Sequence, residues 1–272
     1  MKKLLIILTL LSLLFALAAC SGETTEPEPE PDVGDAVPSV PLEDEEPSDE
    51  EDEPVENTGR IIDPDKPVIA LTFDDGPNTG NSVTILDALE ERGIVATYFV
   101  IGGNINNETA EIMKRAYELG CEYANHSWGW ASMGRMEEEK IIESLTQTSD
   151  KIVEVLGEDA RPRFFRAPNL DTTANMREVV KELGYPLMNG ILGNDWEGSA
   201  TPESIYNLVV PKVQDGSIIL LHDGNSNDAT AEGIGALLDA LLEQGFQFVT
   251  LSELFEIKDV EIEAGKTYER VG

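Results

Sequence analysis

A helix, a glycine and a short apolar strand follow one another four times between residues 83 and 250. The glycines are Gly93, Gly120, Gly184 and Gly245, and the apolar runs after them cover residues 95–100, 121–124, 186–188 and 246–250. Before Gly245, Leu238, Leu241 and Leu242 mark the apolar positions of the expected helix. Each glycine fits the left-handed position that ends a helix. The alternation indicates a parallel sheet with helices outside it, either an open doubly wound sheet or a closed barrel.

The first twenty residues predict export from the cytoplasm. Lys2 and Lys3 precede an apolar stretch over residues 4–17, which is the pattern of a signal peptide. The stretch ends in small residues before Cys20, and this resembles the lipobox of bacterial lipoproteins, in which the cysteine is diacylated. We therefore expect a lipoprotein signal peptide at residues 1–20, lipidation of Cys20 and an extracytoplasmic position as a cell-membrane lipoprotein. The alternative is an ordinary secretory signal with an incidental cysteine.

The next forty residues differ in composition from the rest of the chain. Residues 21–60 hold 16 acidic side chains, one arginine and no aromatic residue. Such a segment buries too little apolar surface to fold, so we expect a disordered linker that acts as a spacer, with an acidic binding tail as the alternative. Residues 61–272 form the expected catalytic domain, with 37 acidic and 16 basic residues. This charge disfavours nucleic acid as a partner. Cys121 is expected to be a small buried hydrophobe.

Two adjacent carboxylates follow the apolar run at residues 68–73. Asp74 and Asp75 stand where a strand would end, and reactive residues gather at the carboxyl ends of strands in α/β folds. Neighbouring side chains of a strand point to opposite faces, so one carboxylate could bind a metal and the other could act as a base. The alternative is a polar turn with a helix cap.

The chain contains only two histidines, and both follow apolar runs. His126 comes after residues 122–124, and His222 comes after residues 217–221. Imidazole can ligate a metal or transfer protons near neutral pH. Two histidines and an acid pair at strand ends indicate one shared site, although two unrelated surface or core histidines would give the same pattern.

Five segments resemble the ordered motifs of the polysaccharide deacetylases, carbohydrate esterase family four. The first is TFDDGP at residues 72–77, and the others lie at residues 125–128, 165–169, 194–196 and 220–223. The resemblance runs from about residue 68 to residue 255. It implies an α/β fold, a distorted and incomplete (β/α) barrel, and metal-dependent hydrolysis of acetyl groups on a polysaccharide.

The resemblance also implies a role for each matching residue. Asp74 would be the general base, and Arg166 would orient it. His222 would be the general acid that protonates the leaving group, and Asp195 would tune its pKa. Around the substrate, the backbone N–H near Asn169 would stabilise the oxyanion, while Trp196 and Leu220 would shape the acetyl pocket.

The expected metal site departs from the family pattern at one position. Asp75 and His126 match the metal ligands, but the second histidine of the motif is replaced by Trp130, which has no lone pair to donate. Three readings follow: water or another oxygen completes the shell, the protein is an impaired binder, or the motif is misaligned. We favour the first, with a loosely bound Zn, Co, Ni or Mn ion. Trp130 would then lie among the substrate-contacting residues.

The motif style is most similar to that of the acetyl xylan esterase branch. Residues 164–170 and 194–196 carry this likeness, together with the aromatic residue in place of the second histidine. We expect a monomer that acts on an acetylated polysaccharide by O-deacetylation. The alternatives are an N-deacetylase of chitooligosaccharide or peptidoglycan, and a catalytically impaired glycan-binding lipoprotein. A magnesium-dependent phosphohydrolase would instead need a second acid two residues from the first and further cations for phosphate.

Overall fold

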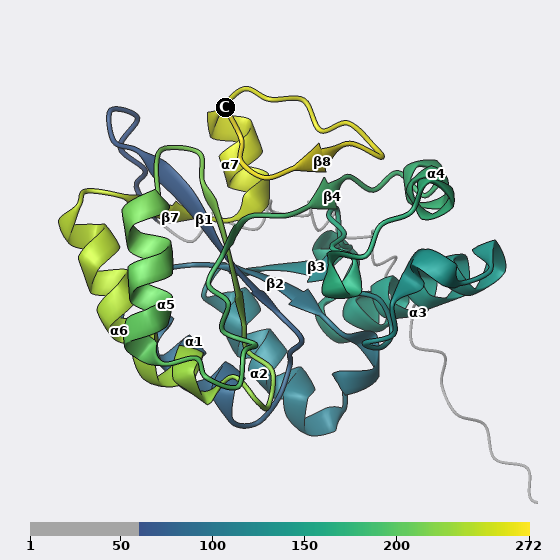
Figure 1. Ribbon diagram of the computed structural model, residues 1–272, viewed down its shortest axis with the longest axis horizontal. Coiled ribbons are helices and arrows are strands. Elements are labelled where there is room, and N and C mark those ends of the chain that lie inside the picture. The colour runs from purple at the N-terminus through teal and green to yellow at the C-terminus, as the bar shows by residue number, and fades with distance from the viewer. Residues whose placement is uncertain (1–59) are drawn as a thin grey trace, which may run out of the picture. The chain divides into compact units, whose positions relative to one another are not determined.

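The structure is a computed structural model that describes residues 60–272 (Figure 1). The predicted signal peptide, the lipidation at Cys20 and linker residues 21–59 lie outside the described residues. No helix within residues 60–272 has the length and apolar character needed to cross a membrane.

The main sheet is parallel and runs in the order β3-β2-β1-β6-β5. Its strands are β1 (Val68–Asp74), β2 (Thr97–Val100), β3 (Glu122–Asn125), β5 (Ile191–Leu192) and β6 (Ile218–His222), and β7 (Gln247–Val249) also pairs with β1. Strand β7 pairs with the first part of β1, at residues 68–70, and β2 pairs with its end, at residues 72–74. Strand β6 pairs with β1 over residues 70–74, which sets Asp74 directly opposite His222.

Beyond β3 the sheet continues only through single bridges. Phe165 forms parallel bridges to Asn125 and to Leu187, and β4 (Leu187–Met188) pairs with β8 (Thr267–Tyr268). The strands therefore curve round without regular pairing along the whole circle. This arrangement decides between the two architectures left open by the sequence, in favour of a distorted, incomplete (β/α) barrel.

Helices cover the outside of the strands (Figure 1). They are α1 (Asn81–Arg92), α2 (Asn107–Glu118), α3 (Glu138–Leu156), α4 (Ala174–Glu182), α5 (Pro202–Val209), α6 (Asp228–Glu243) and α7 (Leu251–Ile257). Short 3-10 turns lie at Gly102–Asn104, Met133–Arg135, Glu158–Ala160, Pro168–Leu170 and Val210–Lys212. The four glycines of the repeated pattern have positive φ angles of 61°, 98°, 84° and 88°, which confirms their place after the helices.

The apolar positions predicted for the helix before Gly245 differ in burial. Leu238 and Leu241 are fully buried in α6, whereas Leu242 is 40% exposed. Cys121 is 2% exposed, and burial raises the pKa of its thiol to about 12, which confirms it as a buried hydrophobe.

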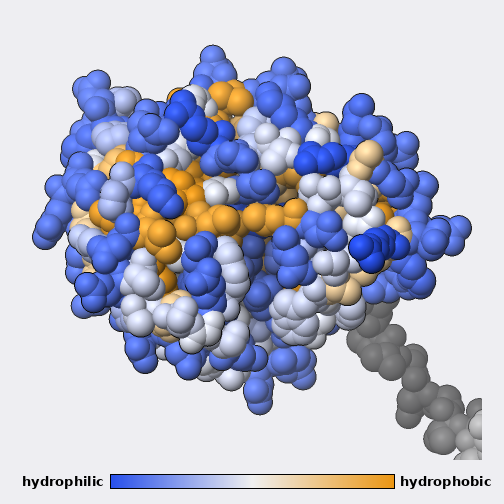
Figure 2. Space-filling view, in the orientation of Figure 1, coloured by the Kyte–Doolittle hydropathy of each residue, from blue (hydrophilic) through white to orange (hydrophobic). Residues whose placement is uncertain are grey.

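The alternation of side chains along β1 connects the core to the site. Ile69, Leu71 and Phe73 belong to the core between the sheet and the helices, whereas Val68 and Ala70 belong to a second cluster on the other face. The period of two then places Thr72 and Asp74 on the face of Val68 and Ala70. Hydrophilic residues dominate the molecular surface in this orientation, with hydrophobic residues gathered in a band across its middle (Figure 2).

Candidate active site

The predicted site residues gather round one pocket at the carboxyl ends of the strands. The pocket has a volume of about 440 Å³. Eight predicted residues line it: Asp74, Asp75, His126, Trp130, Asn169, Trp196, Leu220 and His222. Arg166 and Asp195 lie behind this lining, in contact with Asp74 and His222 respectively. The sequence did not single out Ala167, Pro168, Leu170 and Leu192, which also line the pocket.

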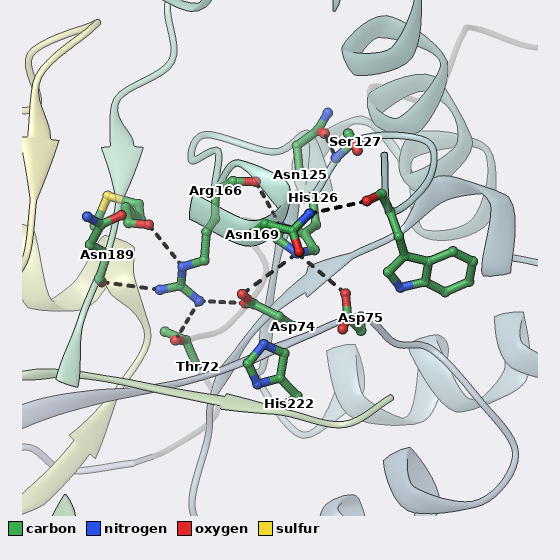
Figure 3. A network of polar contacts seen from close by, with 12 residues as sticks. Thr72, Asp74, Asp75, Asn125, His126, Ser127, Arg166, Asn169, Asn189 and His222 are labelled. Atoms are coloured by element: carbon green, nitrogen blue, oxygen red, sulfur yellow. Dashed lines mark hydrogen bonds and ion pairs between the residues drawn. The ribbon is translucent and has the colours of Figure 1, made fainter. Parts of the chain in front are cut away.

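Asp74 and Arg166 form a buried ion pair beside the pocket. Asp74 is 2% exposed and Arg166 is fully buried, and the Arg166 Nη1 to Asp74 Oδ1 distance is 2.6 Å. Figure 3 shows Asp74 between the guanidinium group and the imidazole of His126. The ion pair fixes the direction of the carboxylate, with Oδ1 on the guanidinium and Oδ2 on the side of His126.

The guanidinium of Arg166 is held from all sides. Its Nε donates to the Met188 carbonyl at 2.9 Å, Nη1 donates to Thr72 Oγ1 at 2.9 Å, and Nη2 donates to the Asn189 carbonyl at 3.3 Å. It also lies over the Phe99 ring, 4.0 Å from the centroid. These contacts satisfy the hydrogen-bond donors of the buried guanidinium and fix its orientation toward Asp74. Thr72 could have been found from the sequence, because it lies on the same strand face as Asp74.

Asp75 leaves the strand in a left-handed conformation, with φ of 78°. The Asn104 amide donates to its carbonyl at 2.8 Å. Because this turn interrupts the alternation of β1, both carboxylates approach the same imidazole: His126 Nε2 lies 3.5 Å from Asp75 Oδ1 and 3.8 Å from Asp74 Oδ2. The expectation that the pair would diverge is therefore wrong, although the two carboxylates keep different partners.

Neither carboxylate caps the following helix. Helix α1 begins at Asn81 after Gly80, and no side chain caps its first turn.

Burial raises the pKa of Asp75, but hydrogen bonding to His126, the charges of both histidines and the contribution of Trp130 outweigh it, so the net pKa is lowered. The lowered pKa favours the ionised form of the Asp75 carboxylate in the pocket.

His126 presents one nitrogen to the carboxylates. Its Nδ1 donates to the Arg166 carbonyl oxygen at 2.8 Å, so Nε2 is the nitrogen that faces the two carboxylates. Two ligands of one divalent ion lie roughly 3 to 3.5 Å apart. The 3.5 Å distance from His126 Nε2 to Asp75 Oδ1 therefore suits a shared ion. Within residues 60–272, however, no three His, Cys, Asp or Glu side chains form a complete metal site.

Trp130 occupies the place of the missing ligand. It lines the same pocket as Asp75 and is 56% exposed. The Asn169 amide lies 3.4 Å from the Trp130 carbonyl and 3.4 Å from Ser132 Oγ, so this loop contacts the loop of the third motif. Asp75 and His126 could hold a divalent ion whose other positions remain open to solvent.

His222 is held by Asp195 on the other side of the pocket. Its Nδ1 lies 2.8 Å from Asp195 Oδ1, and its backbone N–H donates to Asp195 Oδ2 at 2.7 Å. Burial lowers the pKa of His222, but the Asp195 hydrogen bond and the charges of Asp74, Asp195 and Asp75 outweigh it and raise the pKa to about 9. The imidazole is therefore protonated at neutral pH. The Trp196 ring meets it edge-on, with centroids 5.5 Å apart.

Backbone strain is concentrated in the loops of the site. Six residues other than glycine have positive φ within residues 60–272, and five of them belong to these loops: Asp75, Ser127, Asn169, Leu170 and Asn194. Left-handed conformations cost free energy for such residues and persist where the surroundings enforce them, most often at functional sites. The predicted oxyanion position at Asn169 is part of this strained set.

Comparison with known proteins finds relatives among the polysaccharide deacetylases. A sequence profile described as polysaccharide deacetylase matches residues 62–188. A bifunctional xylanase/deacetylase of Pseudobutyrivibrio xylanivorans is 39% identical over 193 residues, which cover 71% of this chain and 31% of the relative. A peptidoglycan-N-acetylglucosamine deacetylase of Bacillus cereus is 32% identical over 197 residues, which cover 70% of this chain and 89% of the relative. The chain spans less than half the length of the first curated relatives that it matches.

Solved structures share the fold. A family 4 acetyl xylan esterase from Clostridium thermocellum, in complex with a cobalt ion, is similar with a TM-score of 0.71 and 36% sequence identity. The match covers 75% of this chain and 98% of that chain. This likeness confirms the barrel-like α/β fold that the sequence predicts.

Proposed function

This chain belongs to the polysaccharide deacetylase family, and on that premise we propose that it removes O-linked acetyl groups from a neutral polysaccharide of the xylan type. The expected enzyme class is confirmed, because the relatives are named deacetylases and esterases, which are hydrolases. One observation carries the proposal. A carboxylate held by a buried arginine and a histidine held by a carboxylate face one pocket from directly paired residues of β1 and β6.

Asp74 is the proposed proton acceptor for the attacking water. Arg166 binds Oδ1 of its carboxylate, which leaves Oδ2 on the side of His126. General base catalysis of this kind contributes about 10² to 10⁴ in rate.

Asp75 and His126 would hold the metal ion. When bound there, a divalent ion supplies Lewis-acid polarisation of the acetyl carbonyl and lowers the pKa of the attacking water. The two residues supply one anionic oxygen ligand and one neutral nitrogen ligand. That donor set suits zinc, cobalt, nickel or manganese. The cobalt complex of the Clostridium thermocellum esterase supports a divalent ion in this family.

His222 is the proposed proton donor to the leaving sugar oxygen. An alkoxide is a poor leaving group, so hydrolysis needs an acid that is protonated at working pH, and the raised pKa of about 9 supports this role. Asp195 holds the imidazole by its Nδ1, so Nε2 is the nitrogen that can deliver the proton.

The surroundings of the pocket favour a neutral glycan. Trp130 and Trp196 line the pocket with 56% and 51% of their surface exposed, and aromatic faces of this kind can pack on sugar rings. The acidic excess of residues 61–272 repels anionic polymers. Similarity to a xylanase/deacetylase and to an acetyl xylan esterase supports O-deacetylation, and similarity to a peptidoglycan deacetylase keeps the N-acetyl alternative.

Acetate release by the full chain tests this function. Acetylated xylan, acetylated chitooligosaccharide and peptidoglycan would be offered at equal acetyl concentration, with added metal and with chelator. We expect acetate chiefly from xylan, and none from the Asp74→Asn variant. Faster release from either amide substrate would overturn the choice of ester. Glycan binding without release from any substrate would favour the impaired-binder alternative.

We also propose that the protein is anchored to the outer side of the cell membrane through Cys20. The lipobox-like residues before Cys20 and the acidic spacer after it support this location. The mature wild-type chain should partition into detergent and carry acyl mass, and Cys20→Ser should abolish both properties. A soluble wild-type chain that is cleaved before Cys20 and carries no acyl group would refute the anchor.

A further inference from the structure

His222 and Asp195 form what we call the acid side of the site, and a third residue outside the sequence motifs, Thr230, contacts Asp195. Asp195 Oδ1 faces His222 Nδ1, while Oδ2 accepts hydrogen bonds from the His222 backbone N–H at 2.7 Å and from the Thr230 hydroxyl at 2.6 Å. Thr230 is 1% exposed and Asp195 is 2% exposed, so this contact is shielded from water. A hydroxyl can rotate to donate to a carboxylate, and such charge-assisted bonds are about twice as strong as neutral ones.

The first turn of α6 is built toward Asp195. Asn227 precedes this helix and stands in the capping position, yet its side chain makes no cap hydrogen bond. Its amide instead donates to the Asp195 carbonyl at 3.1 Å. An asparagine here ordinarily accepts from the backbone of the first turn and stabilises the helix. Helix α6 therefore has no side-chain cap, and the side chains of Asn227 and Thr230 hydrogen-bond to Asp195 instead.

We propose that Thr230 is a positioning residue for the general acid. By donating to Oδ2, its hydroxyl orients the Asp195 carboxylate so that Oδ1 meets His222 Nδ1, and it stabilises the carboxylate as an anion. Asn227 holds the backbone of the same residue. The effect on turnover rests on the proposed function, in which His222 protonates the leaving oxygen, whereas the effect on the imidazole itself does not.

Several charged groups act on His222 besides Asp195. From the end of β1 come Asp74 and Asp75, and both favour its protonated form. Arg166 pairs with Asp74, and His126 lies between the two carboxylates, so these groups belong to the base side of the pocket. A change confined to Thr230 leaves all four of them in place, which isolates the contribution of Asp195.

The decisive variant is Thr230→Val, which keeps the shape and removes the hydroxyl. Thr230→Ser restores the hydroxyl and should rescue the wild-type behaviour. Thr109→Val is the matched control, because Thr109 is also a buried residue in the first turn of a helix, in a capping box of α2 far from Asp195 in the chain. If Thr230→Val does not fold, Thr230→Ala removes the same donor with less bulk.

An NMR titration of the imidazoles in the metal-free full chain gives the first measurement. The chain has only two histidines, so the His222 signal is identified by comparison with a His126→Gln variant. We expect the pKa of His222 to fall by about one unit in Thr230→Val, a tenfold change in proton affinity, and to stay unchanged in Thr109→Val. An unchanged His222 pKa in Thr230→Val would overturn the proposal.

The second measurement compares two leaving groups. Turnover of acetylated xylan oligomers needs a proton on the leaving oxygen, whereas para-nitrophenyl acetate releases a stable phenolate without one. Above about pH 9, where the lower pKa leaves less protonated His222, Thr230→Val should lower kcat on the xylan oligomers about tenfold, with KM and the para-nitrophenyl acetate rate little changed. Equal losses on both substrates would mean a structural role and overturn the proposal. If the wild type hydrolyses no glycan ester, the proposed function fails, and the NMR result still decides the role of Thr230.

Discussion

Asp74 and His222 sit on directly paired residues of β1 and β6, but their surroundings act in opposite directions. Asp74 faces the guanidinium of Arg166, a permanent cation. His222 faces Asp195, whose hydrogen bond and charge, with the charges of Asp74 and Asp75, raise the pKa of the imidazole to about 9. One group beside a cation and one beside an anion suit the proposed roles of base and acid.

The two sides also differ in how they are supported. On the base side, the backbone carbonyls of Met188 and Asn189 and the Thr72 hydroxyl hold Arg166. On the acid side, the backbone N–H of His222 and the side chains of Thr230 and Asn227 hold Asp195. The acid side therefore has two side-chain partners that single substitutions can remove, and the base side has one.

The largest expected effect comes from removing the base. Asp74→Asn keeps an oxygen that can accept from Arg166 but loses the ability to take a proton, so acetate release should fall about 10² to 10⁴-fold. Metal binding, measured by calorimetry, should persist, because Asp75 and His126 are unchanged. Asp75→Ala is the matched comparison and should weaken metal binding itself. Full turnover by Asp74→Asn would mean that another group is the base.

The second effect tests the acid side. Asp195→Asn removes the anion beside His222, so its pKa should move from about 9 toward the ordinary imidazole value of about 6.5. Activity that needs protonated His222 should then be lost at lower pH, which shifts the alkaline limb of the pH–rate profile downward. In the wild type, the stability from this raised pKa is fully present below about pH 6.5 and is lost as pH rises through about 9. An unmoved alkaline limb would assign it to another group.

Much of the site was predictable because the motifs stand at strand ends. The two histidines and the acid pair each follow an apolar run, and parallel strands bring such positions to one edge of the sheet. Thr230 and Asn227 could not be found this way, because they lie at the start of α6 and not at a strand end. Their contacts also depend on the direction in which the Asp195 side chain points. The convergence of Asp74 and Asp75 on His126 was missed because a left-handed φ at an aspartate is not visible in the sequence.

The fold was predictable to a similar extent. Four helix and strand pairs were marked by a glycine between them, but α3 was not, because Gly157 leads into a 3-10 turn and the chain resumes pairing only at Phe165. The choice between an open sheet and a barrel depended on single bridges at Phe165, which no periodic pattern records. Local patterns therefore predicted the elements, and long-range contacts decided how they close.

A third, smaller effect concerns the close packing of Gly76 against Asp223. A Cβ added at Gly76 would lie 2.3 Å from Asp223 Oδ2, and Asp223 is buried, with its pKa raised by burial to about 7. Gly76→Ala should therefore lower the free energy of unfolding by about 1 to 3 kcal/mol, as overpacking does. Gly198→Ala is the control, because a Cβ there meets nothing within 4 Å.

Gly76 directly follows Asp75, so Gly76→Ala should also weaken metal binding. Thermal unfolding and calorimetry measure these two quantities. A variant as stable as wild type would show that Asp223 moves aside at little cost.

The smallest expected effect is a gain of metal affinity in Trp130→His. Position 130 follows His126 by four residues, and its side chain lines the same pocket as the proposed ligands Asp75 and His126. A histidine there could add a third protein ligand, the number usual in catalytic zinc sites. Because the side chain at this position is 56% exposed, the new imidazole would be loosely held, and we expect a gain of only about tenfold.

The same comparison tests how loose the wild-type site is. With two protein ligands, the wild type should lose its ion readily to chelator and regain activity with cobalt, nickel or manganese at least as well as with zinc, since these ions accept water-rich shells. Trp130→His should shift that preference toward zinc, and the pKa of His222 on the acid side should stay the same. Calorimetry with each ion, before and after the substitution, measures the change. Tight stoichiometric zinc in the wild type, unaltered by Trp130→His, would mean that a ligand other than Asp75 and His126 completes the site.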